Sequence, residues 1–381
     1  MRILHVISTL DVGGAEVHLL SQVRGQAARG HAVRVAYLLG EGALADDFRA
    51  AGASWVGRVG KGPPAVGRIA RLARGTEILH SHLLRADFLC APAALLAGRR
   101  RSWVSGKHND ERALLRPLVS RLHGAVGNLP ARTIVLSDHV GRFVERHGRV
   151  RSTKLRRVYY GIDPTPFERA AAAGPERHRA LRAELGLAPG NVVLVCVARF
   201  APQKAHDVLL RAFRSAHDRD HRLRLLLVGG DPFGDGRERA EALARELGLL
   251  EGGACVFAGI RRDVPALLGA ADAFVMASLW EGLGLVFLEA MAARLPVLAT
   301  EVSAVPEVVT HEETGLLVPP SDADALARAV LALAGDRDRR RAMGERGAQV
   351  VRERFGLDRM VEETLSVYEE ILATRTTRLR P

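Results

Sequence analysis

The 381-residue sequence lacks any apolar run of about 18 residues without a charge, the length that a membrane-spanning helix needs. Asp272, Glu281, Glu289 and Arg294 interrupt its most hydrophobic region. The opening stretch, Met1–Ser8, lacks the long apolar segment and small-residue cleavage site of a signal peptide and instead resembles a first strand. These absences predict a protein that stays in the cytoplasm.

Cysteine and aromatic residues are also scarce. The three cysteines, Cys90, Cys196 and Cys255, are odd in number, far apart and set among apolar neighbours. This pattern indicates reduced core thiols rather than a disulfide framework or a metal site. Aromatic residues make up 5% of the chain, too few to favour the stacking surface of a protein that binds single-stranded nucleic acid. We therefore expect no nucleic-acid partner.

Acidic residues are few in the first half of the chain. Residues 1–190 hold 30 Lys and Arg against 15 Asp and Glu, a net charge of +15, whereas residues 191–381 hold 25 against 28, a net charge of −3. A basic face in the first half could dock on anionic lipid at the inner face of the membrane or receive a phosphorylated acceptor. The alternative is a compositional bias of an arginine- and alanine-rich chain, and the sequence leaves both open.

The length of the chain predicts two domains, and strand-like runs that alternate with helical patterns predict α/β folds with parallel sheets. Two prolines and an alanine-glycine stretch near residues 161–175 mark the linker. We predict domains over 1–172 and 173–356, with an amphipathic last helix over 357–375. The predicted strands are 3–7, 32–38, 77–80, 102–105 and 132–136 in the first domain, and 192–197, 223–228, 255–258, 273–276 and 297–299 in the second.

Two carboxylates, Glu281 and Glu289, lie eight residues apart across a glycine loop and the start of a helix. Gly282 and Gly284 let backbone N–H groups approach a ligand closely. A carboxylate in the loop can accept hydrogen bonds from sugar hydroxyls, and one inside the helix can reach a ribose diol. The alternative is a capping glutamate followed by a solvated one. The pattern favours a nucleotide-sugar site.

Arg199 and Lys204 follow a predicted strand and precede a helix. Both would lie near a helix N-terminus, where they can bind a diphosphate without a metal. The alternative is a solvated loop. Gly13 and Gly14 open another helix after the first strand, where backbone N–H groups could contact a phosphate or the acceptor, or simply form a tight turn.

His108 ends a predicted strand and could orient a hydroxyl nucleophile or accept its proton. His80 and His82 end a neighbouring strand. Three such histidines could in principle bind zinc, but nothing in the sequence shows that they converge. We therefore predict no metal site and no cofactor other than the nucleotide-sugar co-substrate.

Taken together, these motifs resemble the retaining glycosyltransferases of family four, the glycogen-synthase-like group with the GT-B architecture. The resemblance covers nearly the whole chain, and its most specific parts are the glutamate loop and Thr314–Pro320. It implies two Rossmann-like β/α/β domains that face each other across a cleft, with a last helix that crosses back to the first domain. The residues that carry it are Gly13–Glu16, Val158–Asp163, Arg199–Lys204, Glu281–Ala292, Pro306–Glu307 and Thr314–Pro320.

The resemblance implies a role for each matched residue. Arg199 and Lys204 would bind the donor diphosphate, and His108 would contact the sugar and help to orient the attack. The remaining donor-site residues are Gly13 and Gly14 near the phosphates, Gly259, Ile260 and Arg261 beside the base, Glu281, Gly282, Leu283, Gly284 and Leu285 near the sugar, and Glu289 at the ribose. The sequence departs from the family pattern at Ala198, Ala205, Ser303 and Ala304, where glycine is usual, and at Tyr160, where asparagine is usual.

The predicted function is metal-independent, retaining transfer of a sugar from a UDP- or GDP-type donor to a hydroxyl of a glycan, lipid-linked or small-molecule acceptor. No activated serine, cysteine or pair of acids stands out, which suits a same-face attack without an enzyme nucleophile. The alternatives are a nucleotide-sugar 2-epimerase with the same two-domain layout, and a basic peripheral membrane-binding protein.

Overall fold

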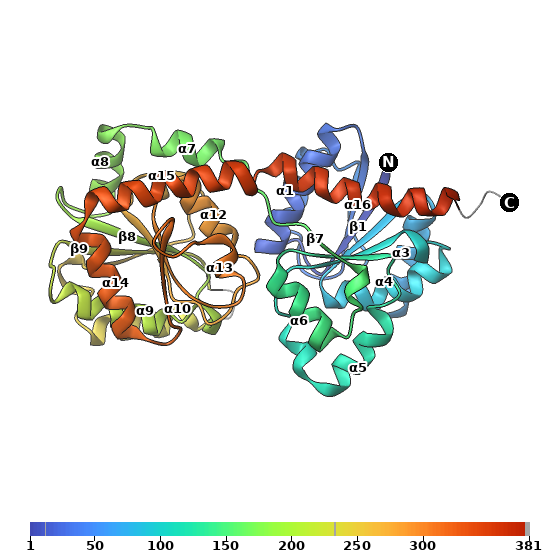
Figure 1. Cartoon of the computed structure of the whole chain (residues 1–381), viewed down its shortest axis with the longest axis horizontal. Coiled ribbons are helices and arrows are strands. Elements are labelled where there is room, and N and C mark those ends of the chain that lie inside the picture. Colours follow the sequence, from blue (N-terminus) through green and yellow to red (C-terminus); the bar gives the residue numbers. More distant parts are fainter. Residues whose placement is uncertain (12, 232–233, 378–381) are drawn as a thin grey trace. The chain divides into compact units, whose positions relative to one another are not determined.

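The computed structural model describes residues 1–11, 13–231 and 234–377, with side chains described up to residue 374. The chain forms two compact units. The first comprises Met1–Ile162 together with the chain from Phe355 onward, and the second comprises Asp163–Arg354. Each unit is a parallel β-sheet flanked by helices (Figure 1). This is the α/β architecture that the alternation of strand and helix patterns predicts.

The first unit contains a seven-stranded sheet in the order β3-β2-β1-β4-β5-β6-β7. All of its strand pairs are parallel. The strands are β1 (Arg2–Ile7), β2 (Ala32–Tyr37), β3 (Trp55–Arg58), β4 (Ile78–His82), β5 (Trp103–Lys107), β6 (Arg132–Val135) and β7 (Leu155–Arg157). The helices are α1 (Gly14–Ala28), α2 (Ala45–Ala50), α3 (Gly62–Arg74), α4 (Leu84–Leu96), α5 (Pro117–Val126), α6 (Asp138–Gly148) and α16 (Leu357–Thr377), with short 3-10 helices η1 (Arg100–Ser102), η2 (Arg112–Leu115) and η3 (Ser152–Lys154).

Both faces of this sheet are buried, which explains why four of the six residues of β1 are apolar. Ile3 and Ile7 point into a core that α1, α2 and α16 complete. Leu4 and Val6 point into a second core that α3 and α4 complete. Alternate residues of a strand face opposite sides of a sheet, so a strand covered on both sides has no polar face.

The last helix, α16, packs against α1 within the first unit (Figure 1). Its apolar side chains, including Val361 and Tyr368, belong to the same core as β1. Tyr368 also ties the helix to the sheet, because its hydroxyl lies 2.6 Å from Nδ1 of His80 and accepts a hydrogen bond from Gln22. The predicted return of the last helix to the first domain is therefore confirmed.

The second unit contains a six-stranded sheet in the order β10-β9-β8-β11-β12-β13, again with every pair parallel. The strands are β8 (Val192–Val197), β9 (Leu223–Val228), β10 (Cys255–Gly259), β11 (Ala273–Met276), β12 (Val297–Thr300) and β13 (Gly315–Val318). The helices are α7 (Thr165–Ala171), α8 (Pro175–Glu184), α9 (His206–His217), α10 (Gly236–Glu246), α11 (Val264–Gly269), α12 (Leu285–Ala292), α13 (Val305–Val308), α14 (Ala323–Gly335) and α15 (Arg337–Arg354), with η4 (Pro202–Lys204) and η5 (Glu251–Gly253).

The second unit begins at Asp163, before the boundary predicted at residue 172. The helix between these two points, α7, packs against α11 and α12. Its Glu168 also forms an ion pair with Arg352 of α15. These contacts place α7 in the second unit. Within the described residues, no helix combines the length and the apolar character that a membrane span requires.

Candidate active site

The centre of the second sheet supplies the first group of predicted site residues. The sheet order changes direction between β8 and β11, and ligands of open α/β sheets bind beside the carboxyl ends of strands at such a point. The loops that follow these two strands are joined by hydrogen bonds. The backbone N–H of Leu279 donates to the carbonyl of Gln203 at 2.8 Å, and the Gln203 side chain donates to the carbonyl of Trp280 at 2.6 Å. The two loops therefore form one rim.

Lys204 and Glu281 meet at this rim. Lys204 Nζ lies 2.5 Å from Glu281 Oε1, and the hydroxyl of Ser278 donates to the same oxygen at 2.6 Å. The two charged side chains are only 12% and 6% exposed. Separating the two side chains would leave each buried charge without a counter-charge, which is costly. The pair therefore holds Lys204 in a defined position. We call Lys204, Glu281 and Ser278 the Lys204 cluster.

A left-handed residue places Lys204 beside the start of α9. Ala205 has φ 45° and ψ 52° and is the residue that precedes the helix. An L-residue in this conformation costs roughly 1–2 kcal/mol, which glycine avoids. Because α9 is twelve residues long, its N-terminal N–H groups add a partial positive charge next to the lysine.

Arg199 lies exposed in the loop that follows β8. Among the residues that the structure describes, no carboxylate pairs with its guanidinium. It differs in this respect from Lys204, which already has a carboxylate partner. Arg199 is therefore a cation that is free to bind an anion close to the Lys204 cluster.

Glu289 lies in α12, which begins after Gly284 in a left-handed conformation with φ 83°. The side chain is partly buried, and burial raises the pKa of its carboxyl from 4.5 to about 7. Within the described part of the chain, nothing hydrogen-bonds to this carboxyl. A desolvated acceptor without a partner is a group that a ligand's hydroxyls can satisfy.

The other predicted donor-site residues are placed in different ways. Gly282 and Leu283 are buried in the loop before α12, and Leu285 is the first residue of that helix. Ile260, after β10, is 80% exposed. Arg261 already has a carboxylate partner, because its guanidinium donates two 2.7 Å hydrogen bonds to Asp263. The guanidinium of Arg261 is therefore not free, and Ile260 offers an exposed apolar side chain in the same loop.

In the first unit, Gly13 precedes α1 with an extended backbone, and Gly14 is the first residue of the helix. Glu16, in the first turn, is buried and accepts a 2.7 Å hydrogen bond from the hydroxyl of Thr9. A Cβ on Gly13 would lie 2.5 Å from a carboxylate oxygen of Glu16. The glycine therefore provides room for this carboxylate at the start of the helix.

His108 is buried and part of a hydrogen-bonded chain of imidazoles. Its Nε2 lies 2.8 Å from Nδ1 of His82, whose Nε2 lies 2.9 Å from Nδ1 of His5. The ends of the chain are the Tyr160 hydroxyl, 2.7 Å from His108 Nδ1, and Gln26 Oε1, 2.9 Å from His5 Nε2. We call His5, His82 and His108 the histidine chain. Both ring nitrogens of His108 are thus occupied.

The histidine chain has one self-consistent set of protons when the Gln26 carbonyl oxygen faces His5. Each imidazole then donates from Nε2 and accepts at Nδ1, and the Tyr160 hydroxyl donates to His108. Every ring is neutral in this arrangement. Burial, with a smaller contribution from Lys107, lowers the pKa of His108 to about 3, and burial lowers that of His5 to about 4.

A second polar network lies beside the chain. The buried Asp87 carboxylate pairs with Lys107 and accepts hydrogen bonds from Ser81 and Ser105. Lys107 Nζ also lies 3.0 Å from Nε2 of His123. Neither this network nor the contribution of His5 was predicted from the sequence. One signal was available, since alternation along a strand places His80 and His82 on the same face.

Two family models match this chain. The model described as "Glycosyltransferase Family 4" matches residues 12–165, and "Glycosyl transferases group 1" matches residues 178–350. A GDP-mannose-dependent alpha-(1-6)-phosphatidylinositol monomannoside mannosyltransferase of Mycobacterium tuberculosis is 33% identical over 271 residues, which cover 69% of this chain and 68% of the relative. The chain belongs to the family 4 and group 1 glycosyltransferases.

Two further relatives of this glycosyltransferase have other names. A D-inositol 3-phosphate glycosyltransferase of Nocardia farcinica is 39% identical over 55% of this chain and 46% of the relative, so the match spans about half of that protein. The N-acetyl-alpha-D-glucosaminyl L-malate synthase of Bacillus anthracis is 27% identical over 78% of this chain and 75% of the relative.

Solved structures confirm the GT-B fold of the glycosyltransferase. Anabaena HepE in complex with UDP-glucose superposes with a TM-score of 0.86 at 23% identity, over 96% of this chain and all of the other. Sucrose-phosphate synthase from Thermosynechococcus elongatus gives a TM-score of 0.77 at 22% identity, over 98% of this chain and all of the other.

Three departures of this glycosyltransferase from its family pattern have a visible structural context. Ala205 and Ser303 replace the usual glycines, and both have positive φ values, 45° and 49°. Tyr160 replaces asparagine. Its ring stacks on His18 with centroids 3.9 Å apart, and its hydroxyl ends the histidine chain.

Three histidines of the glycosyltransferase could hold a metal ion. The ligand nitrogens of His5, His80 and His82 lie within 4.8 Å of one another. However, His5 and His82 already share a hydrogen bond, which a metal would have to replace. The metal-free site predicted from the sequence stays a prediction.

Proposed function

We propose that this glycosyltransferase moves a sugar from a nucleoside diphosphate sugar, of the UDP or GDP type, to a hydroxyl acceptor with retention at the anomeric carbon and without a metal ion. The observation that carries the proposal is the arrangement at the carboxyl ends of β8 and β11. Two cations, Arg199 and Lys204, lie near the start of a helix, and the uncommitted carboxyl of Glu289 lies in the helix that follows β11.

The donor's diphosphate is the ligand that suits the two cations. Arg199 can fork onto two phosphate oxygens, and Lys204 can add a point charge. Together with the N-terminus of α9 they offset the negative charge that develops on the departing diphosphate. Fixed positive groups thereby take the role that a divalent ion has in other transferases.

The two glutamates would bind the sugar and the ribose. A diphosphate would compete with Glu281 for Lys204, and Glu281 could then accept hydrogen bonds from sugar hydroxyls. Glu289 would accept from the ribose diol and so gain the partner that it lacks. Ile260 offers an exposed apolar side chain to the base.

In the proposed reaction, the bond from the anomeric carbon to the phosphate oxygen breaks, and the acceptor oxygen bonds to that carbon on the same face. The acceptor proton passes to the departing phosphate oxygen. His108 is a poor candidate for the base, because both of its nitrogens are occupied and burial lowers its pKa to about 3.

Replacing Lys204 tests the proposal. Lys204→Ala should lower turnover by at least about 100-fold, as expected when a fixed charge-stabilising group is lost. The matched control is Arg211→Ala, which removes an exposed cation from the second turn of α9. Product NMR should show the donor's anomeric configuration, and activity should persist in EDTA. An inverted product, loss of activity in EDTA or near wild-type turnover of Lys204→Ala would each contradict the corresponding part of the proposal.

We further propose that the acceptor carries a negative charge. Three relatives are named for phosphatidylinositol monomannoside, D-inositol 3-phosphate and L-malate, all of which are anionic, and residues 1–190 have a net charge of +15. An acceptor panel that pairs inositol phosphate with inositol, and malate with its dimethyl ester, tests this. Equal rates for charged and neutral members of each pair would refute it.

Peripheral binding to an anionic membrane is supported by α5 and the turn before it. Leu115, Leu118 and Leu122 are 46%, 68% and 54% exposed, and Arg116 and Arg121 lie in the same segment. Exposed leucines beside cations are typical of a helix that lies on a lipid surface. Leu118→Ser with Leu122→Ser should reduce cosedimentation with phosphatidylglycerol vesicles. Unchanged cosedimentation would argue against this role.

A further inference from the structure

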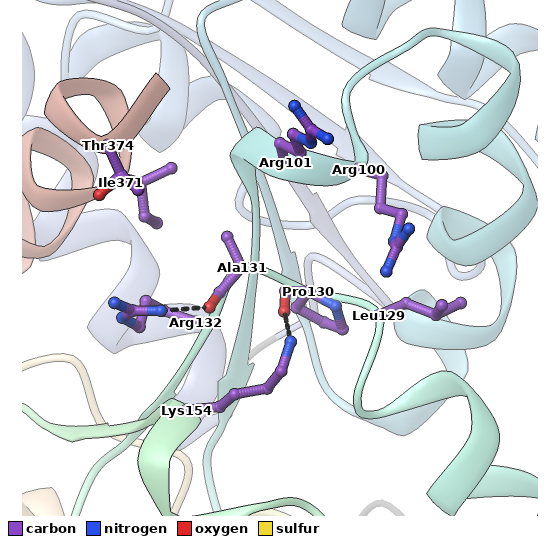
Figure 2. A pocket seen from close by; sticks show the side chains of 9 residues that line it. All are labelled: Arg100, Arg101, Leu129, Pro130, Ala131, Arg132, Lys154, Ile371 and Thr374. Atoms are coloured by element: carbon purple, nitrogen blue, oxygen red, sulfur yellow. Dashed lines mark hydrogen bonds between the residues drawn. The ribbon is translucent and has the colours of Figure 1, made fainter. Parts of the chain in front are cut away.

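A basic pocket lies at the amino ends of β5, β6 and β7. It has a volume of about 370 Å³. The carboxyl ends of the same parallel strands carry Lys107, the last residue of β5, and lead to His108. The pocket therefore lies at one end of these strands, and His108, which the sequence predicts to contact the substrate, lies beyond the other end. Its lining residues are Arg100, Arg101, Leu129, Pro130, Ala131, Arg132, Lys154, Ile371 and Thr374 (Figure 2).

Four cations line this pocket, and among the described residues only one of them has a carboxylate partner. Arg132 pairs with Glu370 at 2.5 Å, and Arg156 outside the pocket pairs with the same oxygen. Lys154 donates instead to the backbone carbonyl of Pro130. Within the described ranges, Arg100 and Arg101 have neither a carboxylate nor a hydrogen-bond partner. The pocket thus carries more positive charge than its neighbours balance.

The neighbouring Arg99 stabilises the fold through hydrogen bonds to backbone carbonyls. Its guanidinium donates to the carbonyls of Ala73 and Arg74, at 3.2 and 2.7 Å, and so joins two loops. Arg100 makes no such contact. Figure 2 shows Arg100 and Lys154 reaching toward Pro130 from two different segments. Lys154 is held there by its hydrogen bond to the Pro130 carbonyl, whereas among the described residues no hydrogen bond or ion pair holds Arg100 in place.

The positive charges also act on one another. Burial lowers the pKa of Lys154, and the nearby charges of Arg100, Arg132 and Arg151 lower it further. Like charges held close together repel, and an anion bound between them would remove this repulsion. A phosphate group presents several oxygens to planar guanidinium and ammonium donors, and it is small enough for the pocket.

We propose that this pocket is a binding site for a phosphate group, with Arg100 and Lys154 as its main ligands and Arg101 and Arg132 at its sides. The phosphate can belong to a soluble phosphorylated compound or to a phospholipid headgroup. The site is separate from the proposed donor site, which lies in the second unit.

Titration calorimetry with inorganic pyrophosphate on the full-length chain tests the proposal. The donor site would also bind pyrophosphate, so the titrations use a background that carries Arg199→Ala and Lys204→Ala. Pyrophosphate should still bind in this background, and binding should weaken as ionic strength rises. Adding Arg100→Ala or Lys154→Ala should weaken it about tenfold each, the loss expected for one charge-assisted hydrogen bond.

The matched control removes two exposed cations elsewhere in the first unit, with Arg142→Ala and Arg146→Ala in α6. It removes as much positive charge as Arg100→Ala and Lys154→Ala together but should leave pyrophosphate affinity within about twofold, because neither side chain lines the pocket and salt screens exposed charges. If pyrophosphate does not bind in the background protein, or if the pocket and control variants lose affinity equally, the proposal is wrong.

Vesicles distinguish the two sources of phosphate. Phosphatidylcholine vesicles with and without phosphatidic acid are mixed with the background protein and with its Arg100→Ala, Lys154→Ala derivative. If phosphatidic acid increases vesicle binding only when the pocket is intact, and pyrophosphate competes, the ligand is a headgroup. If pyrophosphate binds in the pocket but vesicle binding does not depend on these two residues, the ligand is a soluble phosphate compound.

Discussion

Replacing Glu289 with glutamine should make the protein more stable at neutral pH while weakening donor binding. The carboxyl is partly buried, has no hydrogen-bond partner among the described residues, and has its pKa raised from 4.5 to about 7 by burial. The ionised form is therefore disfavoured in the folded protein. Glutamine keeps the shape of the side chain and removes the charge.

The pH dependence follows from which state holds the proton. Between about pH 4.5 and 7 the unfolded chain has released the proton of Glu289, whereas the folded protein still holds it. The folded state binds more protons in this window, so its stability falls as pH rises through it and then levels off. At about 1.4 kcal/mol per pKa unit, the full loss is at most about 3.5 kcal/mol.

Chemical unfolding at pH 4.5 and pH 8 measures this effect. Glu289→Gln and the wild type should have similar stabilities at pH 4.5, and the variant should be more stable at pH 8 by up to about 3.5 kcal/mol. Other titrating groups are common to both proteins and cancel in the difference. A stability difference that does not change with pH would refute the reasoning.

The same variant should bind a nucleoside diphosphate sugar more weakly. Glutamine replaces one carboxylate oxygen with an NH₂ donor and removes the negative charge, so it accepts weaker hydrogen bonds from the ribose hydroxyls than a carboxylate does. A loss of about tenfold is expected for one charged hydrogen bond. If the variant is more stable but binds the donor as tightly as the wild type, Glu289 contacts neither the ribose nor the sugar.

Three further substitutions test local features by their effect on unfolding. Ala205→Gly should stabilise the protein by up to about 1 kcal/mol, because glycine relieves the left-handed strain at φ 45°, and no gain would show that the strain is already relaxed. Gly106→Ala should cost about 1–3 kcal/mol, since its Cβ would lie 2.9 Å from Nε2 of His80. Gly67→Ala, with open space around the new Cβ and a helical position, should stabilise instead and serves as its control. Glu370→Gln should cost about 1 kcal/mol or less at pH 7. Hydrogen bonds from its two arginine partners lower its pKa to about 2, so the cost should disappear as pH falls from 4.5 toward 2.

Strands buried on both sides could be predicted from the sequence, whereas three of the four edge strands could not. The predicted bounds of β8, β9 and β11 agree with the structure because β8 and β11 are continuous apolar runs and β9 is apolar apart from Arg224. The strands missed in the sequence, β3, β7 and β13, lie at sheet edges. The residues of β7 are Leu-Arg-Arg, which carry neither an apolar run nor a clear alternation, so only pairing with β6 makes them a strand.

The contacts within the site could not be predicted from the spacing of residues along the sequence. Lys204 and Glu281 were both predicted as ligands of the donor, but their 2.5 Å contact joins residues 77 positions apart. The histidine chain likewise requires the register that places β1 beside β4, with His5 opposite His80. A sequence can show that polar residues follow strands. It cannot show which of them already satisfy one another.

That distinction assigns different roles to the two sets of polar residues. At the rim of the second unit, Arg199 and Glu289 have no partners among the described residues, so binding a ligand would satisfy them. In the first unit, both nitrogens of His108 are already hydrogen-bonded, and its pKa of about 3 makes it a weak base at neutral pH. Rigid, neutral imidazoles suit the positioning of an acceptor better than the removal of its proton. The proton is then left to the departing phosphate, which agrees with the same-face transfer proposed above.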